Sequence, residues 1–254
     1  MTSPVTRVPS VTAPAPLPDG AGLTHRGCVR ERNEDSILTD PGGTLWAIAD
    51  GMGGHGHGDV ASDIVIECLA SITDTEAWSD PGGSLVTQFE RANSRVRDRA
   101  RQLGSPGMGA TAVALVVRQA LASVAWVGDC RAYLCRRGAL RLLTRDHTLV
   151  QDLMDQGEIS SEEAALHPES HVVTRAIGGG PRVEVDVVRV PLFAEDWLLL
   201  CSDGLTGCLY EERMVMALTT PMSPQDVCRQ LLADALEVGA PDNVSVIAVH
   251  MRGA

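Results

Sequence analysis

Lysine is absent from the 254-residue sequence, so all 21 basic residues are arginine. They are outnumbered by 33 acidic residues, and the formal net charge is −12. Nucleic acids and anionic membranes are bound through basic patches, so we expect neither as a partner and do not expect a nuclease. Arginine suits phosphate recognition, but a compositional bias of the source genome explains the missing lysine more simply.

The sequence also lacks the signals of zinc sites, disulfide frameworks and membrane segments. Its seven cysteines form no Cys-x-x-Cys pair and are odd in number, which favours reduced thiols in a cytoplasmic protein. No charged start is followed by an apolar stretch of signal-peptide length, and no run approaches the roughly 18 apolar residues of a membrane span. We therefore expect a soluble, cytoplasmic protein.

Aromatic residues are scarce, whereas hydrophobic residues make up 44% of the chain. The core must therefore be built mainly from Val, Leu, Ile and Ala. Residues 1–20 contain five prolines and show no periodicity, which is typical of a disordered tail. The remaining length, residues 21–254, suits one sheet-rich domain.

Helical and strand-like patterns alternate along this domain. Apolar residues at helical spacing predict helices over about residues 61–72 and from about residue 84. Short β-rich runs separated by small turns predict antiparallel hairpins between residues 108 and 143. Because helices come in pairs between groups of strands, we expect an α+β fold in which antiparallel sheets stack face to face with helices outside.

Capping residues predict where three further helices begin. Ser223, followed by Pro224, predicts the start of a helix near the C-terminus, and Ser160 with Glu163 forms a capping box. Asp146 is expected to cap a helix between these strands and that box. Residues 157–182 have weaker periodicity and are a candidate for a mobile flap.

Acidic residues recur at the ends of apolar, strand-like runs: Asp50, Asp129, Asp203 and Asp242. Taken alone, Asp50 is best explained as a turn cap after the run Leu45 to Ala49. If the strands share a sheet, however, the carboxylates converge, and such a cluster is costly unless cations neutralise it. Because the carboxylates and the backbone carbonyl of Gly51 offer oxygen ligands, the pattern predicts a site for a hard cation.

Seven short motifs follow one another along the sequence. They are Arg30-x-x-Asn33-Glu34-Asp35, Asp50-Gly51-Met52-Gly53-Gly54, Gly107-Met108-Gly109-Ala110-Thr111, Val127-Gly128-Asp129-Cys130-Arg131, Asp146-His147, Ser202-Asp203-Gly204-Leu205 and Pro241-Asp242-Asn243. In this order they resemble the bacterial metal-dependent protein phosphatases, the PPM family, and the resemblance covers about residues 22 to 250. Each motif is weak by itself, but seven in register are specific. The resemblance implies a four-layer α-β-β-α sandwich that hydrolyses phosphoserine and phosphothreonine with a pair of Mn²⁺ or Mg²⁺ ions.

The resemblance also implies the ligands of this metal pair. Asp50 matches the carboxylate that bridges both ions, and Gly51 matches the residue that gives a backbone carbonyl to the second ion. Asp203 and Asp242 resemble the other direct ligands. Oxygen ligands of this kind suit hard cations, and paired ions can activate water for in-line attack.

Other motif residues match positions around the ions. Glu34 and Asp35 match acids that act mostly through metal-bound waters. Arg30 matches the residue that grips the substrate phosphate, for which the planar guanidinium fork is suited. The alternative is that Arg30 belongs to a solvated, charged loop.

The sequence departs from the family pattern at the position of the general acid. Some members place a histidine directly after the first Asp-Gly, where it is proposed as general acid, whereas this chain has Met52. His55 and His57 lie close in sequence, but a histidine in a glycine-rich turn is more often a solvated surface group. The general acid therefore stays unassigned.

A second departure concerns a third ion. Many relatives carry an aspartate, at the position of Gly207, that helps Asp129 and Asp203 hold it. Without that carboxylate we expect two tightly bound ions and a weak third ion at most.

We expect a Ser/Thr phosphoprotein phosphatase whose partners are phosphorylated proteins, including Ser/Thr kinases and their substrates. One alternative is a catalytically silent PPM-like module that binds phosphoproteins or a partner, which the intact metal-ligand positions disfavour. Another is a phosphatase for small phosphoesters, which would need a deep, closed pocket.

Overall fold

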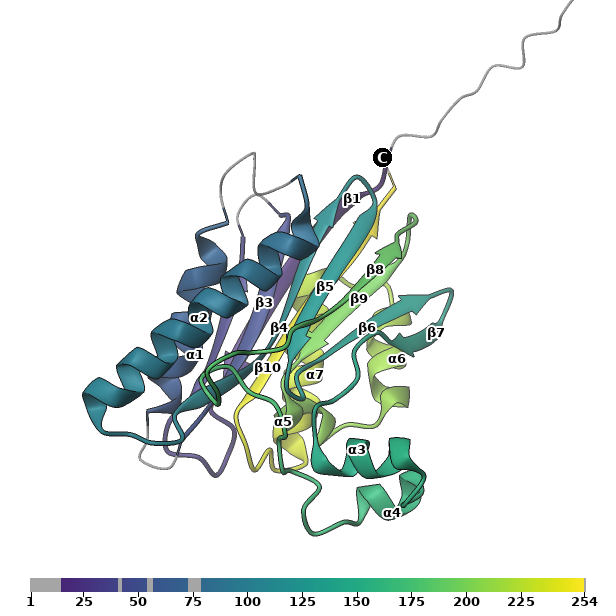
Figure 1. The fold of residues 1–254 in the computed structure, drawn as a ribbon. Helices are drawn as coiled ribbons and strands as arrows, with labels where there is room; N and C mark the ends of the chain where they lie inside the picture. Colours follow the sequence, from purple (N-terminus) through teal and green to yellow (C-terminus); the bar gives the residue numbers. More distant parts are fainter. Residues whose placement is uncertain (1–14, 41–42, 54–56, 73–78, 254) are drawn as a thin grey trace, which may run out of the picture.

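Two antiparallel sheets of five strands face each other in the computed structural model, which describes residues 15–40, 43–53, 57–72 and 79–253 (Figure 1). The first sheet has the strand order β1 (Leu17–His25), β10 (Val244–Arg252), β9 (Trp197–Cys201), β6 (Arg131–Arg136) and β7 (Ala139–Leu142). The second sheet has the order β2 (Asp35–Thr39), β3 (Leu45–Met52), β4 (Gly109–Arg118), β5 (Leu121–Val127) and β8 (Asp186–Pro191).

Helices cover the outer faces of both sheets (Figure 1). The second sheet is covered by α1 (Gly58–Ala70) and α2 (Pro81–Leu103), and the first by α6 (Glu211–Thr219) and α7 (Pro224–Glu237). The short helices are α3 (Leu149–Gln156), α4 (Ser161–Ala165) and α5 (Asp203–Thr206). The expected four-layer α-β-β-α sandwich is therefore confirmed. In the part of the chain that the structure describes, no helix is both long and apolar enough to cross a membrane.

Three clusters of buried side chains fill the three interfaces between these layers. The first, which includes Phe89, lies between the second sheet and its helices; the middle one, which includes Trp46, lies between the sheets. The third, which includes Leu231, lies between the first sheet and α6 and α7. Aliphatic residues dominate all three clusters, as the shortage of aromatic residues requires.

The alternation of side chains along β3 shows which way its acid points. Trp46 and Ile48 belong to the cluster between the sheets, whereas Ala47 and Ala49 belong to the cluster under the helices. Asp50 continues the first series. Its carboxylate therefore projects into the space between the two sheets, at their edge.

Strand β1 begins at Leu17, so the domain boundary expected at residue 21 falls inside a strand. It pairs along its whole length with β10, from Leu17 opposite Arg252 to His25 opposite Val244. Pro18 is tolerated because β1 is an edge strand. On the outer side of an edge strand no neighbouring strand needs a hydrogen bond from the N–H that proline lacks. The tail prediction for residues 1–14 lies outside the described residues.

The two antiparallel hairpins expected between residues 108 and 143 are confirmed as β4–β5 and β6–β7, which belong to different sheets because the chain crosses between the sheets after Val127. Two other sequence-based expectations need correction. Strand β3 does not stop at Asp50 but continues to Met52. Thr148, whose hydroxyl accepts a hydrogen bond from the Gln151 N–H, caps α3 in place of Asp146.

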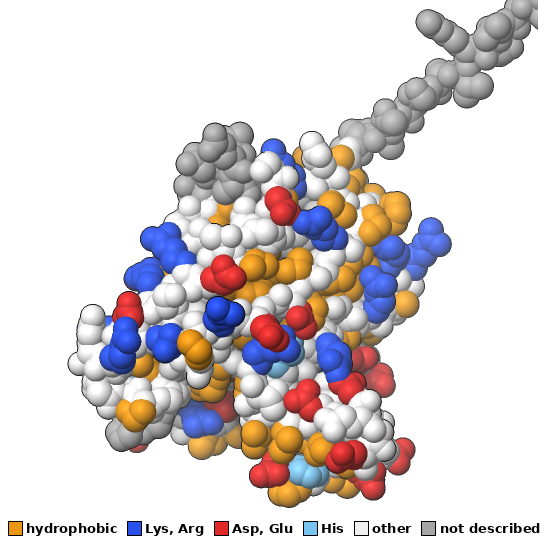
Figure 2. All heavy atoms as spheres, in the orientation of Figure 1, with side chains coloured by type: hydrophobic (Ala, Val, Ile, Leu, Met, Phe, Trp, Pro, Cys, Tyr) orange, Lys and Arg blue, Asp and Glu red, His pale blue; other side chains and the backbone are white. Residues whose placement is uncertain are grey.

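Other local expectations are confirmed. The capping box of Ser160 and Glu163 begins α4, and Ser223 caps α7 with Pro224 at its first position. Acidic side chains gather over the corner that α3 and α4 form (Figure 2). They include the exposed residues Asp155, Glu158 and Glu162.

Candidate metal centre

Asp35 and Asp50 stand directly opposite each other on the neighbouring strands β2 and β3, so their side chains share a face. Asp35 is buried, and its Oδ2 accepts hydrogen bonds from the hydroxyl groups of Ser202 (2.9 Å), which follows β9, and Ser245 (2.6 Å), which lies in β10 of the first sheet. Its Oδ1 is buried without a hydrogen-bond partner. The Asp35 Oδ2 thus links the two sides of the sandwich by hydrogen bonds, whereas its Oδ1 is available to a ligand.

Asp203 and Asp242 reach the same place from the first sheet. Asp203 begins α5 directly after β9, and Asp242 lies just before β10. A Cβ on Gly204 would overlap the carbonyl oxygen of Asn243, so only glycine lets these two segments lie this close. The carboxyl groups of Asp50 and Asp203 interact across the gap between the sheets, where Asp203 contributes to raising the pKa of Asp50.

These acids influence one another's pKa, although their strands belong to two facing sheets and not to the single sheet that the sequence pattern assumed. Burial, together with the charges of Asp35, Asp203 and Asp129, raises the pKa of Asp50 well above its ordinary value. Burial and the charges of Asp203 and Asp242 raise the pKa of Asp35 to about 7. Burial and the Asp203 charge raise the pKa of Asp129 to about 7 as well. Like charges crowded at a sheet edge hold protons that a cation would replace.

Gly51 is required by backbone packing. A Cβ at this position would overlap the carbonyl oxygen of Gly58, at the start of α1, and would press on that of Glu34. The Gly51 N–H donates to the Glu34 carbonyl oxygen (3.1 Å), and the Gly58 N–H donates to the Glu34 carboxylate (3.3 Å). These contacts place the Glu34 side chain beside Gly51.

Arg30 forms an ion pair with Asp242, in which its Nη2 lies 2.7 Å from the carboxylate Oδ2. The hydrogen bond to Asp242 is the main reason why the pKa of Arg30 is raised. Both side chains face solvent, with 59% of Arg30 and 39% of Asp242 exposed. A predicted phosphate-binding residue and a predicted metal ligand are therefore partners.

Asn243, which the sequence motif contains but to which no role was given, holds the loop that carries Arg30. Its Oδ1 accepts from the Glu34 N–H (2.7 Å), and its Nδ2 donates to the carbonyl oxygens of Arg26 (3.0 Å) and Arg32 (2.9 Å). The sequence signal for this role was the position of the asparagine directly after Asp242. An amide that becomes buried beside a site acid has to satisfy several hydrogen bonds.

Asp129 lies where the chain crosses from β5 to β6. Gly128 before it has a φ of 99°, and a Cβ there would overlap Thr111. His147 fastens this turn, because its N–H donates to the Gly128 carbonyl (2.9 Å) and its Nδ1 accepts from the Gly128 N–H (3.0 Å). The motif residues thus shape the backbone that presents Asp129.

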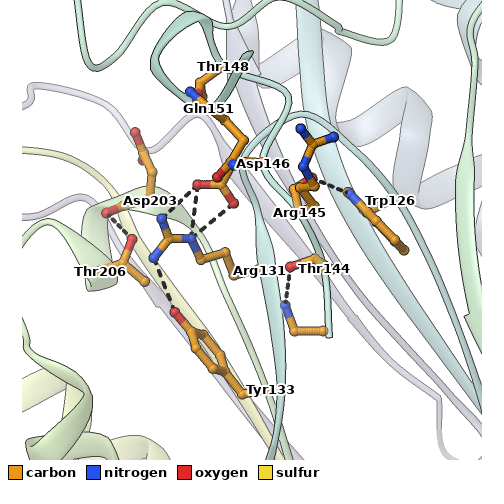
Figure 3. A network of polar contacts seen from close by, with 11 residues as sticks. Trp126, Arg131, Tyr133, Thr144, Arg145, Asp146, Thr148, Gln151, Asp203 and Thr206 are labelled. Atoms are coloured by element: carbon orange, nitrogen blue, oxygen red, sulfur yellow. Dashed lines mark hydrogen bonds and ion pairs between the residues drawn. The ribbon is translucent and has the colours of Figure 1, made fainter. Parts of the chain in front are cut away.

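Asp146 binds Arg131 with both carboxylate oxygens, at 2.7 to 3.0 Å (Figure 3). Arg131 also donates to the Tyr133 hydroxyl (3.3 Å), and Asp203 lies close by in the same view (Figure 3). The pair explains why Asp146 does not cap α3. A fork of this kind holds β6 against the segment that follows β7.

The histidines near the site differ from expectation. His57 is half-buried, and its Nδ1 is buried without a partner, so the expectation of a solvated side chain is wrong for it. His55 lies outside the described residues. His171, from the segment between α4 and β8, lies near enough to Asp203 to lower the pKa of that group against the larger effect of burial.

Gly207, the position of the missing third-ion ligand, is exposed one turn after Asp203. Its φ of −70° and ψ of −19° are helical, so any residue can adopt this backbone. A Cβ would stand 3.2 Å from the Asp203 carbonyl oxygen. A side chain placed there would lie close to Asp203.

The donor set fits a hard divalent cation. The predicted ligands are carboxylates and a carbonyl, and the buried Asp35 Oδ1 without a partner is an oxygen of the same kind. Within the described ranges, no three acidic, histidine or cysteine side chains are already drawn together around one point. The Asp242 carboxylate is paired with Arg30 instead, so it does not join the other acids around one point.

Known proteins resemble this chain over most of its length. The family model for protein phosphatase 2C matches residues 28–153. The serine/threonine protein phosphatase PstP of Mycobacterium tuberculosis is 39% identical over 236 residues, which cover 91% of this chain and 44% of that protein. The chain thus spans less than half the length of this relative.

Two further similarities cover nearly whole chains. The serine/threonine phosphatase stp of Listeria monocytogenes is 35% identical over 240 residues, or 89% of this chain and 93% of that protein. The structure of the PstP catalytic domain in complex with two manganese ions superposes with a TM-score of 0.84 and 35% identity, over 93% of this chain and 99% of that one.

Proposed function

The chain belongs to the protein phosphatase 2C family of metal-dependent Ser/Thr phosphatases, and on that premise we propose that it removes phosphate from phosphoserine and phosphothreonine in proteins. The observation that carries this proposal is the meeting of acidic residues from both sheets at one edge, beside an exposed arginine. They are Asp35, Asp50, Asp129, Asp203 and Asp242, with Arg30.

Two Mn²⁺ or Mg²⁺ ions would be held here by Asp50, the Gly51 carbonyl, Asp203 and Asp242. Glu34 and Asp35 would act from further out, and Asp129 would serve only a third, weak ion. When bound, such a pair activates water as a nucleophile and neutralises the charge of the transferred phosphoryl group. The Asp35 oxygen without a partner supports this assignment.

Arg30 would bind the substrate phosphate. Its hydrogen bond to Asp242 uses one of five N–H donors, and 59% of the side chain is exposed. A phosphate can therefore take the remaining donors in the bidentate geometry that guanidinium favours. Because Asn243 fixes the loop on both sides of Arg30, this group is held in place before substrate arrives.

The openness of the site favours a protein substrate over a small phosphoester. Arg30 and Asp242 both lie at the surface, where a phosphorylated side chain on a larger molecule can reach them. Enclosure, by contrast, is typical of small-molecule sites. We accordingly propose phosphorylated proteins, including Ser/Thr kinases and their substrates, as partners. Seven free thiols suit the reducing cytoplasm as the place of action.

Hydrolysis of a phosphothreonine peptide, with added Mn²⁺ or with excess EDTA, tests this function. We expect turnover only with the metal, and a rate on the peptide well above that on small phosphorylated metabolites. Asp50→Asn should abolish turnover, whereas Glu237→Gln, an exposed acid at the end of α7, should leave it unchanged. Binding of the peptide without hydrolysis in Mn²⁺ would instead indicate a silent phosphoprotein-binding module.

A further inference from the structure

Two of the seven cysteines differ from the others in exposure. All seven are free thiols, and five of them are buried. The remaining two are Cys28, which is exposed, and Cys208, which is half-buried. They are far apart in the sequence, yet Cys28 contacts the C-terminal end of α7 and Cys208 follows α5, which packs against the same helix.

Shared contacts bring these two thiols together. The Cys28 N–H donates to the Ala240 carbonyl (2.8 Å), and its thiol donates to the Leu236 carbonyl (3.8 Å). Cys208 follows α5, which packs against α7, and its side chain and that of Leu236 both pack on the core cluster that contains Ala240. The two groups are close enough that the charge of Cys28 contributes, after burial, to raising the pKa of Cys208.

We propose that Cys28 and Cys208 form a reversible intramolecular disulfide when the protein meets a peroxide. The exposed Cys28 sulfur attacks hydrogen peroxide, which breaks the O–O bond, gives a sulfenic acid and releases one water. The Cys208 sulfur then attacks the Cys28 sulfur and displaces a second water. In total, two thiols and one hydrogen peroxide give one disulfide and two waters. A dithiol reverses the reaction.

The bond would connect two segments that carry site residues. Cys28 lies two residues before Arg30, and Cys208 follows α5, which begins at Asp203. Drawing the two sulfur atoms into a covalent bond moves the loop of Arg30, and a small displacement of a substrate-binding group slows an enzyme strongly. Oxidation should therefore lower phosphatase activity. This second half of the proposal rests on the proposed function.

Mass spectrometry tests the bond without any assay of activity. The full chain is treated with hydrogen peroxide, the remaining thiols are blocked with N-ethylmaleimide, and the protein is digested with trypsin, which cuts after arginine. We expect residues 27–30 joined to residues 190–213, and fragmentation should place the link on Cys208 rather than on Cys201 in the same peptide. Dithiothreitol should separate the two peptides.

Matched variants make the result decisive. Cys28→Ser should give no linked peptide. Cys208→Ser should leave Cys28 as a sulfenic acid that dimedone traps. Both positions are accessible, and thermal unfolding of each reduced variant verifies that it is folded. A linked peptide that uses any other cysteine, a dimer joined through Cys28, or a Cys28 thiol that N-ethylmaleimide still blocks after peroxide would overturn the proposal.

Activity is then measured after the peroxide has been removed and Mn²⁺ supplied. We expect oxidised protein to lose roughly tenfold or more in kcat/KM, to recover it with dithiothreitol, and both serine variants to keep their rates after peroxide. If the disulfide forms but the rate is unchanged, the regulatory half is wrong and the modification site stands. If the reduced protein has no activity, the proposed function fails, while the mass spectrum still decides on the disulfide.

Discussion

The guanidinium of Arg30 lies 2.7 Å from the carboxylate of Asp242, although 212 residues separate the two in sequence. Because both groups are solvent-exposed, this ion pair contributes only about 0–1 kcal/mol to stability. A phosphate that binds Arg30, or a cation that binds Asp242, can therefore break this ion pair at a small cost in free energy. The pair keeps both groups at the site edge in the absence of ligands.

The first prediction concerns phosphate binding by Arg30. Arg30→Ala should lower kcat/KM on a phosphothreonine peptide by roughly 10- to 100-fold, as expected for a hydrogen bond to a charged group worth ~1.5–3 kcal/mol. Arg30→Lys should restore only part of it, since lysine supplies charge without the fork. The matched control is Arg32→Ala in the same loop, which should retain the rate. Unchanged kinetics in both Arg30 variants would place Arg30 in a solvated charge cluster.

The second prediction concerns the acids proposed to hold the ions. Each of the substitutions Asp50→Asn, Asp203→Asn and Asp242→Asn should reduce kcat by roughly a hundredfold or more, because the two metal ions activate the water that acts as the nucleophile. The fold should survive, as circular dichroism would verify. Full activity in excess EDTA would contradict this account of the reaction.

The third prediction concerns a third ion. Calorimetry with Mn²⁺ should show two tight sites, and Gly207→Asp should add a third, because the number of carboxylates sets hard-cation affinity. Gly207→Ala is the control, since the helical backbone at this position accepts either residue. A tight third ion in the unmodified protein would show that another group replaces the missing carboxylate.

The fourth prediction concerns pH. Asp35 and Asp129 have pKa values raised from 3.8 to about 7 by burial and neighbouring charges. The metal-free fold then binds more protons than the unfolded chain between about pH 4 and 7, so its stability should fall as pH rises through this window. Metal must displace these protons, so Mn²⁺ affinity should rise from pH 6 to pH 8. Calorimetry in buffers of different ionisation enthalpy measures the protons released; an affinity independent of pH would oppose this.

The fifth prediction concerns Asn243. Asn243→Ala leaves the Glu34 N–H and two loop carbonyls without their partner and should destabilise the fold by about 1–3 kcal/mol. It should also lower kcat/KM, because the Arg30 loop loses its support. Gln230→Ala, which removes the single amide contact of Gln230 with Asp234 on α7, is the control for both readouts. Thermal unfolding equal in the two variants would show that the amide does not hold the loop.

Local patterns were enough to predict the capping box of α4, the start of α7 and the acids near strand ends, because each depends on neighbouring residues. Family motifs then supplied the layers of the sandwich. Contacts between distant segments could not be predicted in this way. The burial of Asp35 depends on Ser202 and Ser245, and the role of Asp146 depends on Arg131. The ion pair of Arg30 with Asp242 likewise exists only once both sheets are assembled.

Strand β1 is the first element of the chain and has β10, the last, as its neighbour in the sheet. During synthesis β1 must therefore wait, exposed, until almost the whole domain has been made. Such pairing of distant segments slows folding, because the loop entropy is lost before the contact forms. Asp242 arrives with β10. If Asp242 holds a metal ion as proposed, a growing chain completes its metal site only when its last strand emerges.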